Sequence, residues 1–360
     1  MNESEYNWEK LWDVFEKLTQ AKPHEHESIL ESFCADNLTM KKELKGLLKA
    51  HYSQSNLLDQ QPYWQQEFIS NFKPPKQIQD YKIEQKLGSG SLGDVYLASK
   101  QDEGFDQKVA IKFATAGRYS SAILHSFKNE LQILFSLNHP HIERLYEGGV
   151  TDENIPYLIV EYIDGDHLDK YCDDQELSVI DRLKIFQKVC SAVDKVHRSL
   201  IIHRDIKAAN IMVDKQGSAK LLDFGVAKLT RSEASVESTN TNLSNFMMTM
   251  AYASPEQING AQITTASDIY SLGVLLYYLL AGRYPYEIDT NDLSLSIKII
   301  SEVKPKLASE SINTSSKIYT IEANLARLLK GELDQILAKS LAKNPDRRYL
   351  SRSEEHTSEL

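Results

Sequence analysis

The chain has 360 residues, of which 41% are hydrophobic and 26% are charged, and its formal net charge is −10. This length suits one large domain with an appendage or two domains, and the composition is typical of a soluble globular protein. The acidic balance gives no general attraction to nucleic acid or to anionic lipid, so we expect no nucleic-acid partner.

The three cysteines, Cys34, Cys172 and Cys190, are scattered and form no CxxC pair. A disulfide framework or a zinc site is therefore not expected, and the pattern indicates a reducing, cytoplasmic environment. The first residues lack the basic and apolar regions of a signal peptide, and no apolar run is long enough to span a membrane. The longest run, residues 271–281, predicts a buried helix instead.

The first part of the chain is helical in pattern, because apolar residues such as Trp8, Leu11 and Phe15 recur at helical spacing. We predict a helical N-terminal segment over residues 1–54, which is either an independent module or an amphipathic extension docked on the main domain. Residues 55–80 are rich in glutamine and proline, which predicts a linker.

The main domain begins near Tyr81. Its first half shows strand-like apolar spacing, and helical stretches dominate after Asp181. The predicted strands cover residues 81–87, 95–98, 109–113 and 157–162. A β-rich first half followed by a helical second half predicts an α+β fold with two lobes.

A glycine-rich motif occupies residues 87–95, with the pattern GxGxxG at Gly88, Gly90 and Gly93. Glycines allow backbone N–H groups to approach phosphates closely. The same spacing occurs in dinucleotide-binding folds, where it opens a helix. Here a strand beginning at Val95 follows, which favours a hairpin that covers a nucleotide, and a plain glycine turn is the alternative for the motif alone.

A lysine, Lys112, lies at the end of the predicted strand 109–113, where its ammonium group could bind nucleotide phosphates. Such a lysine needs an anion to hold it, and we expect Glu130 on a predicted helix over residues 126–137 to do so. Each residue alone would usually be a solvated surface charge. Their order after the glycine motif favours the functional interpretation.

The densest chemical signal is residues 203–210, His-Arg-Asp-Ile-Lys-Ala-Ala-Asn, followed by Asp-Phe-Gly at residues 223–225. Asp205 can accept or orient a hydroxyl proton. Lys207 can stabilise charge on a transferred phosphoryl group. We expect His203 to pack and form hydrogen bonds rather than to catalyse.

Two further groups, Asn210 and Asp223, offer the hard oxygen ligands that Mg²⁺ prefers. Together with Asp205 and Lys207 they supply a base, a cation and two metal-binding groups. Phosphoryl transfer needs these parts, and their order along the chain is the one found in protein kinases.

The ordered set of motifs resembles the protein kinase family over residues 81–351. It includes Ala-Ser-Pro-Glu at residues 253–256 and Asp268. Residues 148–151 and 157–162 are similar, more specifically, to bacterial eukaryotic-like serine/threonine kinases. The resemblance implies a two-lobed kinase fold, protein substrates, ATP, and Mg²⁺ with Mn²⁺ as an alternative ion.

The resemblance also assigns roles to single positions. Val160 would be the gatekeeper and Glu161 to Ile163 the hinge that grips adenine. The implied nucleotide-binding positions are Gly88, Ser89, Gly90, Gly93, Val95, Ala110, Lys112, Val160, Glu161 and Ile163. The implied catalytic positions are Asp205, Lys207, Lys112 and Glu130, and the metal-binding ones are Asn210 and Asp223.

Two more implications concern substrate class and stability. Lys207 favours serine and threonine over tyrosine substrates, and Thr249 agrees with this. Glu256 and Arg348 would form a buried structural ion pair.

Residues 228–249 are rich in serine, threonine and asparagine. They are either a solvated loop or an activation segment that autophosphorylates, and a homodimer would allow this in trans. The candidate phosphosites are Thr239, Thr241 and Ser244, and Arg204 and Lys228 could hold the phosphate.

The leading hypothesis is an ATP-dependent serine/threonine protein kinase. A pseudokinase scaffold that binds nucleotide without efficient transfer is the alternative, and a kinase for small molecules is a third. Residues 352–360 read as one translated frame of a sequencing adapter, with a natural polar tail as the alternative. We therefore expect the natural protein to continue past residue 351, where a membrane anchor could follow.

Overall fold

The computed structural model describes residues 72–90, 93–102, 105–114, 137–223, 249–288, 292–322 and 324–350, with single positions at 127, 131, 134 and 135. The chain divides into two compact units, Met1–Lys73 and Pro74–Leu360, and every described helix and strand belongs to the second. The predicted N-terminal helices, most of the linker, the candidate phosphosites and residues 352–360 lie outside the described residues.

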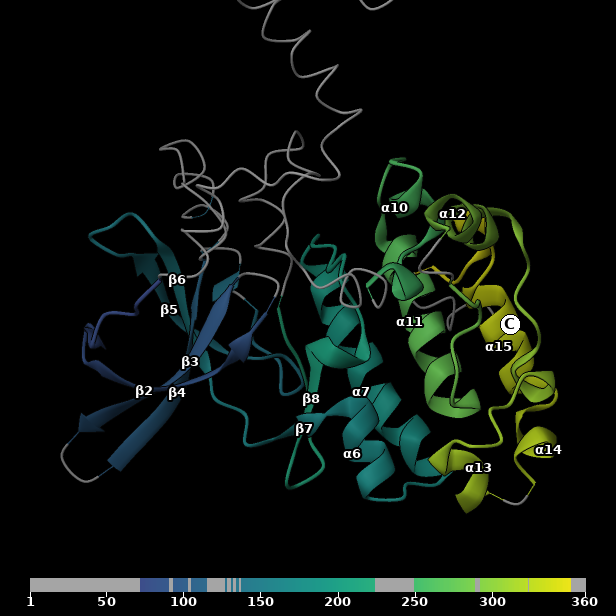
Figure 1. Cartoon of the computed structure of the whole chain (residues 1–360), viewed down its shortest axis with the longest axis horizontal. Coiled ribbons are helices and arrows are strands. Elements are labelled where there is room, and N and C mark those ends of the chain that lie inside the picture. Colours follow the sequence, from purple (N-terminus) through teal and green to yellow (C-terminus); the bar gives the residue numbers. More distant parts are fainter. Residues whose placement is uncertain are drawn as a thin grey trace, which may run out of the picture. The chain divides into compact units, whose positions relative to one another are not determined.

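The first lobe of the second unit is a six-stranded antiparallel sheet in the order β1-β2-β3-β4-β6-β5 (Figure 1). Its strands are β1 (Gln77–Ile78), β2 (Tyr81–Ser89), β3 (Asp94–Asp102), β4 (Phe105–Phe113), β5 (Leu145–Val150) and β6 (Pro156–Glu161). The four strands predicted from the sequence correspond to β2, β3, β4 and β6, so those predictions are confirmed.

Strand β5 was not predicted, because two glycines interrupt its apolar pattern. The structure explains both glycines by close packing. A Cβ at Gly148 would lie 2.6 Å from Leu131 Cδ2, and a Cβ at Gly149 would lie 2.7 Å from the Tyr157 hydroxyl. The glycines therefore make room for side chains of neighbouring elements.

A second sheet of three short antiparallel strands lies within the other lobe, in the order β7 (Gly165–His167), β8 (Ile211–Asp214) and β9 (Ala219–Leu221). Gly165 is needed here, because a Cβ at this position would lie only 2.0 Å from the Val213 carbonyl oxygen. The predicted catalytic and metal-binding residues 205–210 lie directly before β8, and Asp223 lies two residues after the end of β9.

Helices make up most of the second lobe (Figure 1). They are α6 (Leu168–Asp174), α7 (Val179–Arg198), α10 (Pro255–Ile258), α11 (Thr265–Ala281), α12 (Leu293–Glu302), α13 (Lys317–Ile321), α14 (Leu325–Leu329) and α15 (Glu332–Ser340). Short 3₁₀ helices occupy Ala208–Asn210, Ala308–Glu310 and Pro345–Arg347. The predicted α+β architecture with two lobes is confirmed.

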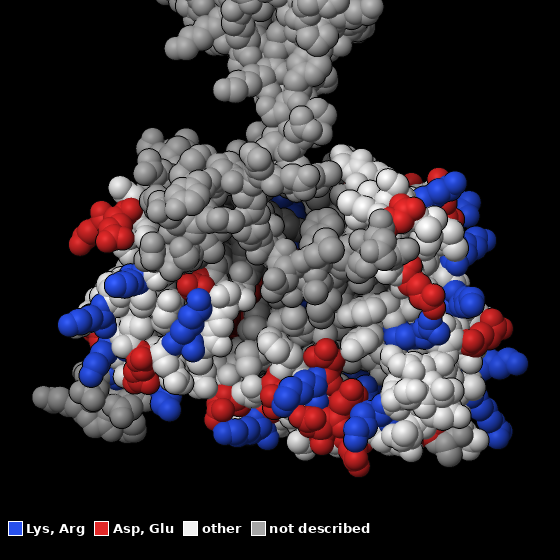
Figure 2. All heavy atoms as spheres, in the orientation of Figure 1, with Lys and Arg blue, Asp and Glu red and all other residues white. Residues whose placement is uncertain are grey.

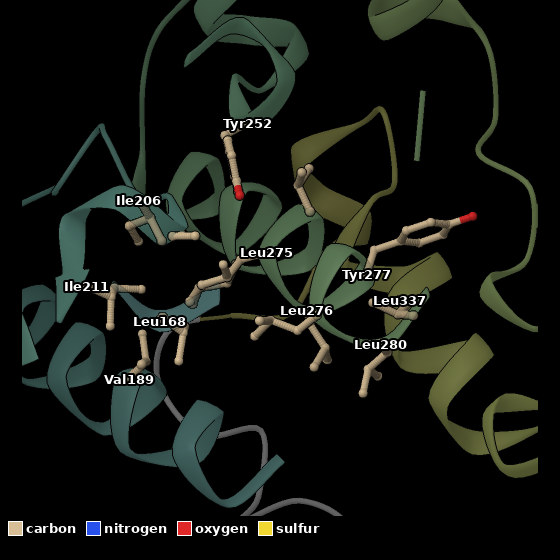
Figure 3. Packing of buried hydrophobic residues seen from close by; sticks show 14 of the residues in the cluster. Leu168, Val189, Ile206, Ile211, Tyr252, Leu275, Leu276, Tyr277, Leu280 and Leu337 are labelled. Atoms are coloured by element: carbon tan, nitrogen blue, oxygen red, sulfur yellow. The ribbon is translucent and has the colours of Figure 1, made fainter. Parts of the chain in front are cut away.

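Helix α11 begins at a capping box formed by Thr264 and Ser267 and ends at Gly282, which has a left-handed φ of 67°. Its apolar residues surround the whole helix, so it is buried in the lobe, as the apolar run 271–281 predicted. Figure 3 shows its leucines lying between Leu168 and Val189 on one side and Leu337 on the other.

A second apolar cluster lies against the large sheet. Phe127, Leu131, Leu134 and Leu137 pack on it at helical spacing, and they contact Ala110, Leu158 and Val160. The described positions within 126–137 include helical ones, as predicted. Glu130 lies outside the described residues.

On the face shown in Figure 2, lysine and arginine side chains lie among aspartates and glutamates over the described residues. On α6, for example, Lys170 pairs with Asp166 and Asp174. Among the described residues, no helix is both long and apolar enough to cross a membrane. The described cysteines, Cys172 and Cys190, carry free thiols.

Candidate active site

The loop before the 3₁₀ helix Ala208–Asn210 is held by Asp268 of α11, which is 1% exposed. One Asp268 carboxylate oxygen accepts hydrogen bonds from the backbone N–H of His203 and from His197 Nε2, both at 2.8 Å. The other accepts from the Arg204 N–H, also at 2.8 Å. Arg204 has a positive φ of 67°, so this carboxylate fixes an unusual backbone conformation next to Asp205.

The His203 ring is fully buried, and its hydrogen bonds define its tautomer. Its Nε2 lies 2.9 Å from the Leu222 carbonyl oxygen, which can only accept, so Nε2 carries the proton. Its Nδ1 accepts a long hydrogen bond of 3.4 Å from the Asp205 N–H. The ring therefore packs and links two segments, as the sequence predicted.

Asp205, Lys207 and Asn210 contact one another directly. Asn210 Nδ2 donates to both the backbone oxygen and the Oδ2 atom of Asp205, at 2.8 Å each. Lys207 Nζ lies 3.0 Å from Asp205 Oδ2 and donates to the Thr249 hydroxyl at 3.1 Å. The base, the cation and the amide predicted from the sequence are thus brought together.

A backbone hydrogen bond of its neighbour, Leu222, places Asp223 beside this group. The Leu222 N–H donates to the Asn210 carbonyl oxygen at 2.9 Å. Asp223 has a positive φ of 53°, and its Oδ1 accepts a hydrogen bond of 2.6 Å from Lys112 Nζ. This ion pair connects strand β4 of the large sheet with the end of the small sheet.

Lys112 has a second carboxylate partner that the sequence motifs did not reveal. Its Nζ donates to both oxygens of Glu143, at 3.0 and 2.8 Å. Burial lowers the pKa of Lys112, but the carboxylates of Asp223 and Glu143 outweigh burial and raise it above its ordinary value. The sequence signal for this partner was an acidic residue type, Glu143, directly after the apolar Ile142 and before strand β5.

The two described ends of the glycine motif, Gly90 and Gly93, meet near Asp223. The Gly90 N–H donates to the Gly93 carbonyl oxygen at 2.7 Å, and Gly93 has a φ of 141° that favours glycine. A Cβ at Gly90 would lie 3.5 Å from Asp223 Oδ2 and 4.0 Å from Val95. Gly90 therefore lies against the Asp223 carboxylate.

The predicted nucleotide-binding positions of the large sheet also face one another. Ala110 of β4 and Val160 of β6 are direct cross-strand partners in one buried cluster, and Val95 packs against that cluster. The Glu161 carboxylate pairs with Lys220 at 2.8 Å. Ile163 is buried, and its backbone N–H donates to no other described residue.

The structural ion pair implied by the family resemblance is present. Arg348 is 2% exposed and donates to both oxygens of Glu256, at 2.6 and 2.9 Å. Its remaining hydrogen bonds go to the carbonyl oxygens of Ala342, Lys343 and Ala266. The pair connects the end of the described chain with α10.

Comparison with known proteins decides the family. The protein kinase domain family matches residues 81–356. The chain belongs to the protein kinase family. Within that family it groups with the bacterial eukaryotic-like serine/threonine kinases, as the sequence motifs predicted.

Three similar bacterial proteins are 32% identical to the chain over about three quarters of this chain. Serine/threonine-protein kinase PknB of Mycobacterium leprae aligns over 289 residues, which are 78% of this chain and 42% of that protein. Serine/threonine-protein kinase PrkC of Bacillus subtilis aligns over 274 residues, 75% of this chain and 38% of that protein. The probable serine/threonine-protein kinase SCO3848 of Streptomyces coelicolor aligns over 279 residues, which are 76% of this chain and 38% of that protein. The chain therefore spans about two fifths of the length of these relatives.

Proposed function

We propose that this chain transfers the γ-phosphoryl group of ATP to serine and threonine hydroxyls of proteins. The observation that carries the proposal is the contact network of Asp205, Lys207 and Asn210, joined through Leu222 to Asp223. Each side chain is held by at least one specific contact, so the site is preorganised. Preorganised charges are the main source of catalysis in phosphoryl transfer.

Asp205 is the proposed base. The hydrogen bond from Asn210 and the ion pair with Lys207 hold its carboxylate in one orientation. A substrate hydroxyl that approaches this carboxylate would transfer its proton there, a contribution of about 10²–10⁴-fold to the rate. Lys207, within 3.0 Å of the same carboxylate, would neutralise charge on the transferred group.

Asn210 and Asp223 are the proposed metal-binding residues. Asn210 uses its amide nitrogen on Asp205, so its side-chain oxygen is the atom suited to a cation. This oxygen and the Asp223 carboxylate are the hard donors that Mg²⁺ or Mn²⁺ prefers. A divalent ion, when bound, supplies positive charge to the phosphate oxygens. Among the described residues, no cluster of three or more His, Cys, Asp and Glu side chains suits a different kind of metal site.

The proposed adenine site lies against β4 and β6. Ala110 and Val160 provide a small apolar surface, with Val95 above it as part of the glycine hairpin. The Ile163 N–H, which donates to no other described residue, suits the acceptor nitrogen of an adenine ring. Gly88, Ser89, Gly90 and Gly93 would then cover the phosphates.

Serine and threonine specificity rests on Lys207 and its hydrogen bond to Thr249. This contact connects the catalytic loop to the start of the segment that leads into α10. Autophosphorylation of Thr239, Thr241 or Ser244, and a homodimer that performs it in trans, extend this proposal to residues outside the described ones.

The proposal is tested with the purified chain and radiolabelled ATP, with and without a generic basic protein, followed by phosphosite mapping. We expect label in the chain and in the added protein. Asp205→Asn should keep the fold and nucleotide binding but lose transfer, because an amide cannot take the proton. The matched control is Asp292→Asn, which changes an exposed N-cap of α12.

Nucleotide binding by the wild-type chain without any transfer would contradict the proposal and favour the scaffold alternative. Equal transfer by Asp205→Asn and wild type would remove Asp205 from its proposed role.

A further inference from the structure

The ammonium group of Lys112 lies between two carboxylates of different origin. Glu143 approaches with both oxygens, at 3.0 and 2.8 Å, and Asp223 with one, at 2.6 Å. The exposed fractions of the three side chains are 7% for Lys112, 8% for Glu143 and 17% for Asp223. A buried carboxylate is tolerated only when it is paired, and for Glu143 the cation is Lys112.

The backbone of Glu143 is bound to the strand that leads to Asp223. The Glu143 N–H donates to the Leu221 carbonyl oxygen at 2.9 Å, and the Leu221 N–H donates to the His141 carbonyl oxygen at 2.9 Å. Ile142 and Leu221 form a parallel bridge between these segments. Asp223 is only two residues beyond Leu221, so one short stretch of paired backbone sets the positions of both carboxylates.

This arrangement allows the two carboxylate contacts of Lys112 to respond differently when nucleotide binds. Asp223 is a proposed metal-binding residue, so its carboxylate would turn toward the cation when nucleotide binds. Glu143 is not one of the proposed metal-binding residues, and its backbone N–H is bonded to Leu221 of β9. The Glu143 contact can therefore persist while the Asp223 contact is exchanged for phosphate.

We propose that Glu143 is a positioning residue for Lys112, and that it holds the lysine at the phosphate site from the strand that carries Asp223. The proposal rests on the proposed kinase function. It adds a second carboxylate anchor to the predicted one, Glu130. Burial raises the pKa of Glu143 to about 7 although Lys112 lowers it, so the carboxylate is costly to keep charged.

The first experiment measures kcat and KM for ATP separately in Glu143→Gln, Glu143→Asp and wild type. Glutamine keeps the shape but removes the charge, so Lys112 should lose its fixed position. We expect kcat/KM for ATP to fall on the order of 10-fold, and the aspartate variant to recover part of this loss. Glu153→Gln, an exposed site in the turn before β6, is the matched control and should behave as wild type.

The second experiment needs no catalysis. In Lys112→Met the Glu143 carboxylate loses its cation and stays buried, so the melting temperature should fall. Adding Glu143→Gln to Lys112→Met should restore part of this loss, whereas Glu153→Gln should not. This coupling is measured by thermal unfolding without ATP.

The outcomes separate the two proposals. An inactive wild type would defeat the kinase function, while the unfolding cycle would still measure the Lys112–Glu143 contact. An active wild type with unchanged kcat and KM in Glu143→Gln would overturn the positioning role. A lower melting temperature in that variant with unchanged kinetics would also overturn it, because the contact would then serve stability alone.

Discussion

Asp268 provides the sharpest test of how the fold positions the chemistry. Its carboxylate accepts three hydrogen bonds of 2.8 Å, from His203 N, His197 Nε2 and Arg204 N. In Asp268→Asn one oxygen becomes an NH₂ group, which cannot accept. In either amide orientation at least one backbone N–H of the catalytic loop then faces a donor.

The magnitude follows from the number of bonds lost. A buried hydrogen bond to a charged group contributes about 1.5–3 kcal/mol, so the free energy of unfolding should fall by about that amount for one lost bond. For a domain of this size the melting temperature should fall by about 3–12 °C. Because Arg204 is next to Asp205, the proposed base should also be displaced, and kcat should fall on the order of 10²-fold.

The assay combines thermal unfolding with steady-state kinetics, and Asp292→Asn is the control. Asp292 caps α12 at an exposed position, and asparagine caps about as well as aspartate, so this variant should be near neutral. If Asp268→Asn matched the control in both measurements, the reasoning that this carboxylate fixes the catalytic loop would be refuted.

Three further variants test other parts of the structure. Glu256→Gln should cost about 3–5 kcal/mol at pH 7, because it leaves Arg348 buried without its anion. Burial raises the pKa of Glu256, but Arg348, Ser267 and a backbone hydrogen bond together outweigh burial, so the net pKa is below the ordinary value. The stabilisation from this ion pair is therefore present above the ordinary pKa of a glutamate and is lost as pH falls through the lowered pKa. The difference in unfolding free energy between Glu256→Gln and wild type, measured with denaturant, should narrow in acid. A constant difference would contradict this. Gly165→Ala should lower the free energy of unfolding by about 1–3 kcal/mol in the same assay, because its Cβ would lie 2.0 Å from the Val213 carbonyl oxygen. Wild-type stability in this variant would show instead that β7 and β8 adapt. Thr249→Val removes the hydroxyl that accepts a hydrogen bond from the Lys207 ammonium group and should lower kcat about 3–10-fold with unchanged KM for ATP, so an unchanged kcat would remove that contact from the mechanism.

Much of the fold followed from local patterns. Four strands of the large sheet and the buried helix α11 were predicted because alternation and apolar runs record which faces are covered. Strands β1 and β5 and the short strands β7, β8 and β9 were not predicted. Glycines, or a length of two to four residues, leave too little periodicity to detect, and β7 pairs with β8, which is far away in the chain.

The sequence by itself determined the chemical inventory: Asp205, Lys207, Asn210 and Asp223 stand in a spacing that few functions other than phosphoryl transfer require. Only the tertiary structure decided which distant side chains hold the site, as for Lys112 and Asp268. Glu143 is 31 residues from Lys112 in the chain, and His197 is 71 residues from Asp268. Such pairs depend on which buried surfaces the folded chain brings together, and a burial pattern along one strand or helix records that a face is covered but not by what.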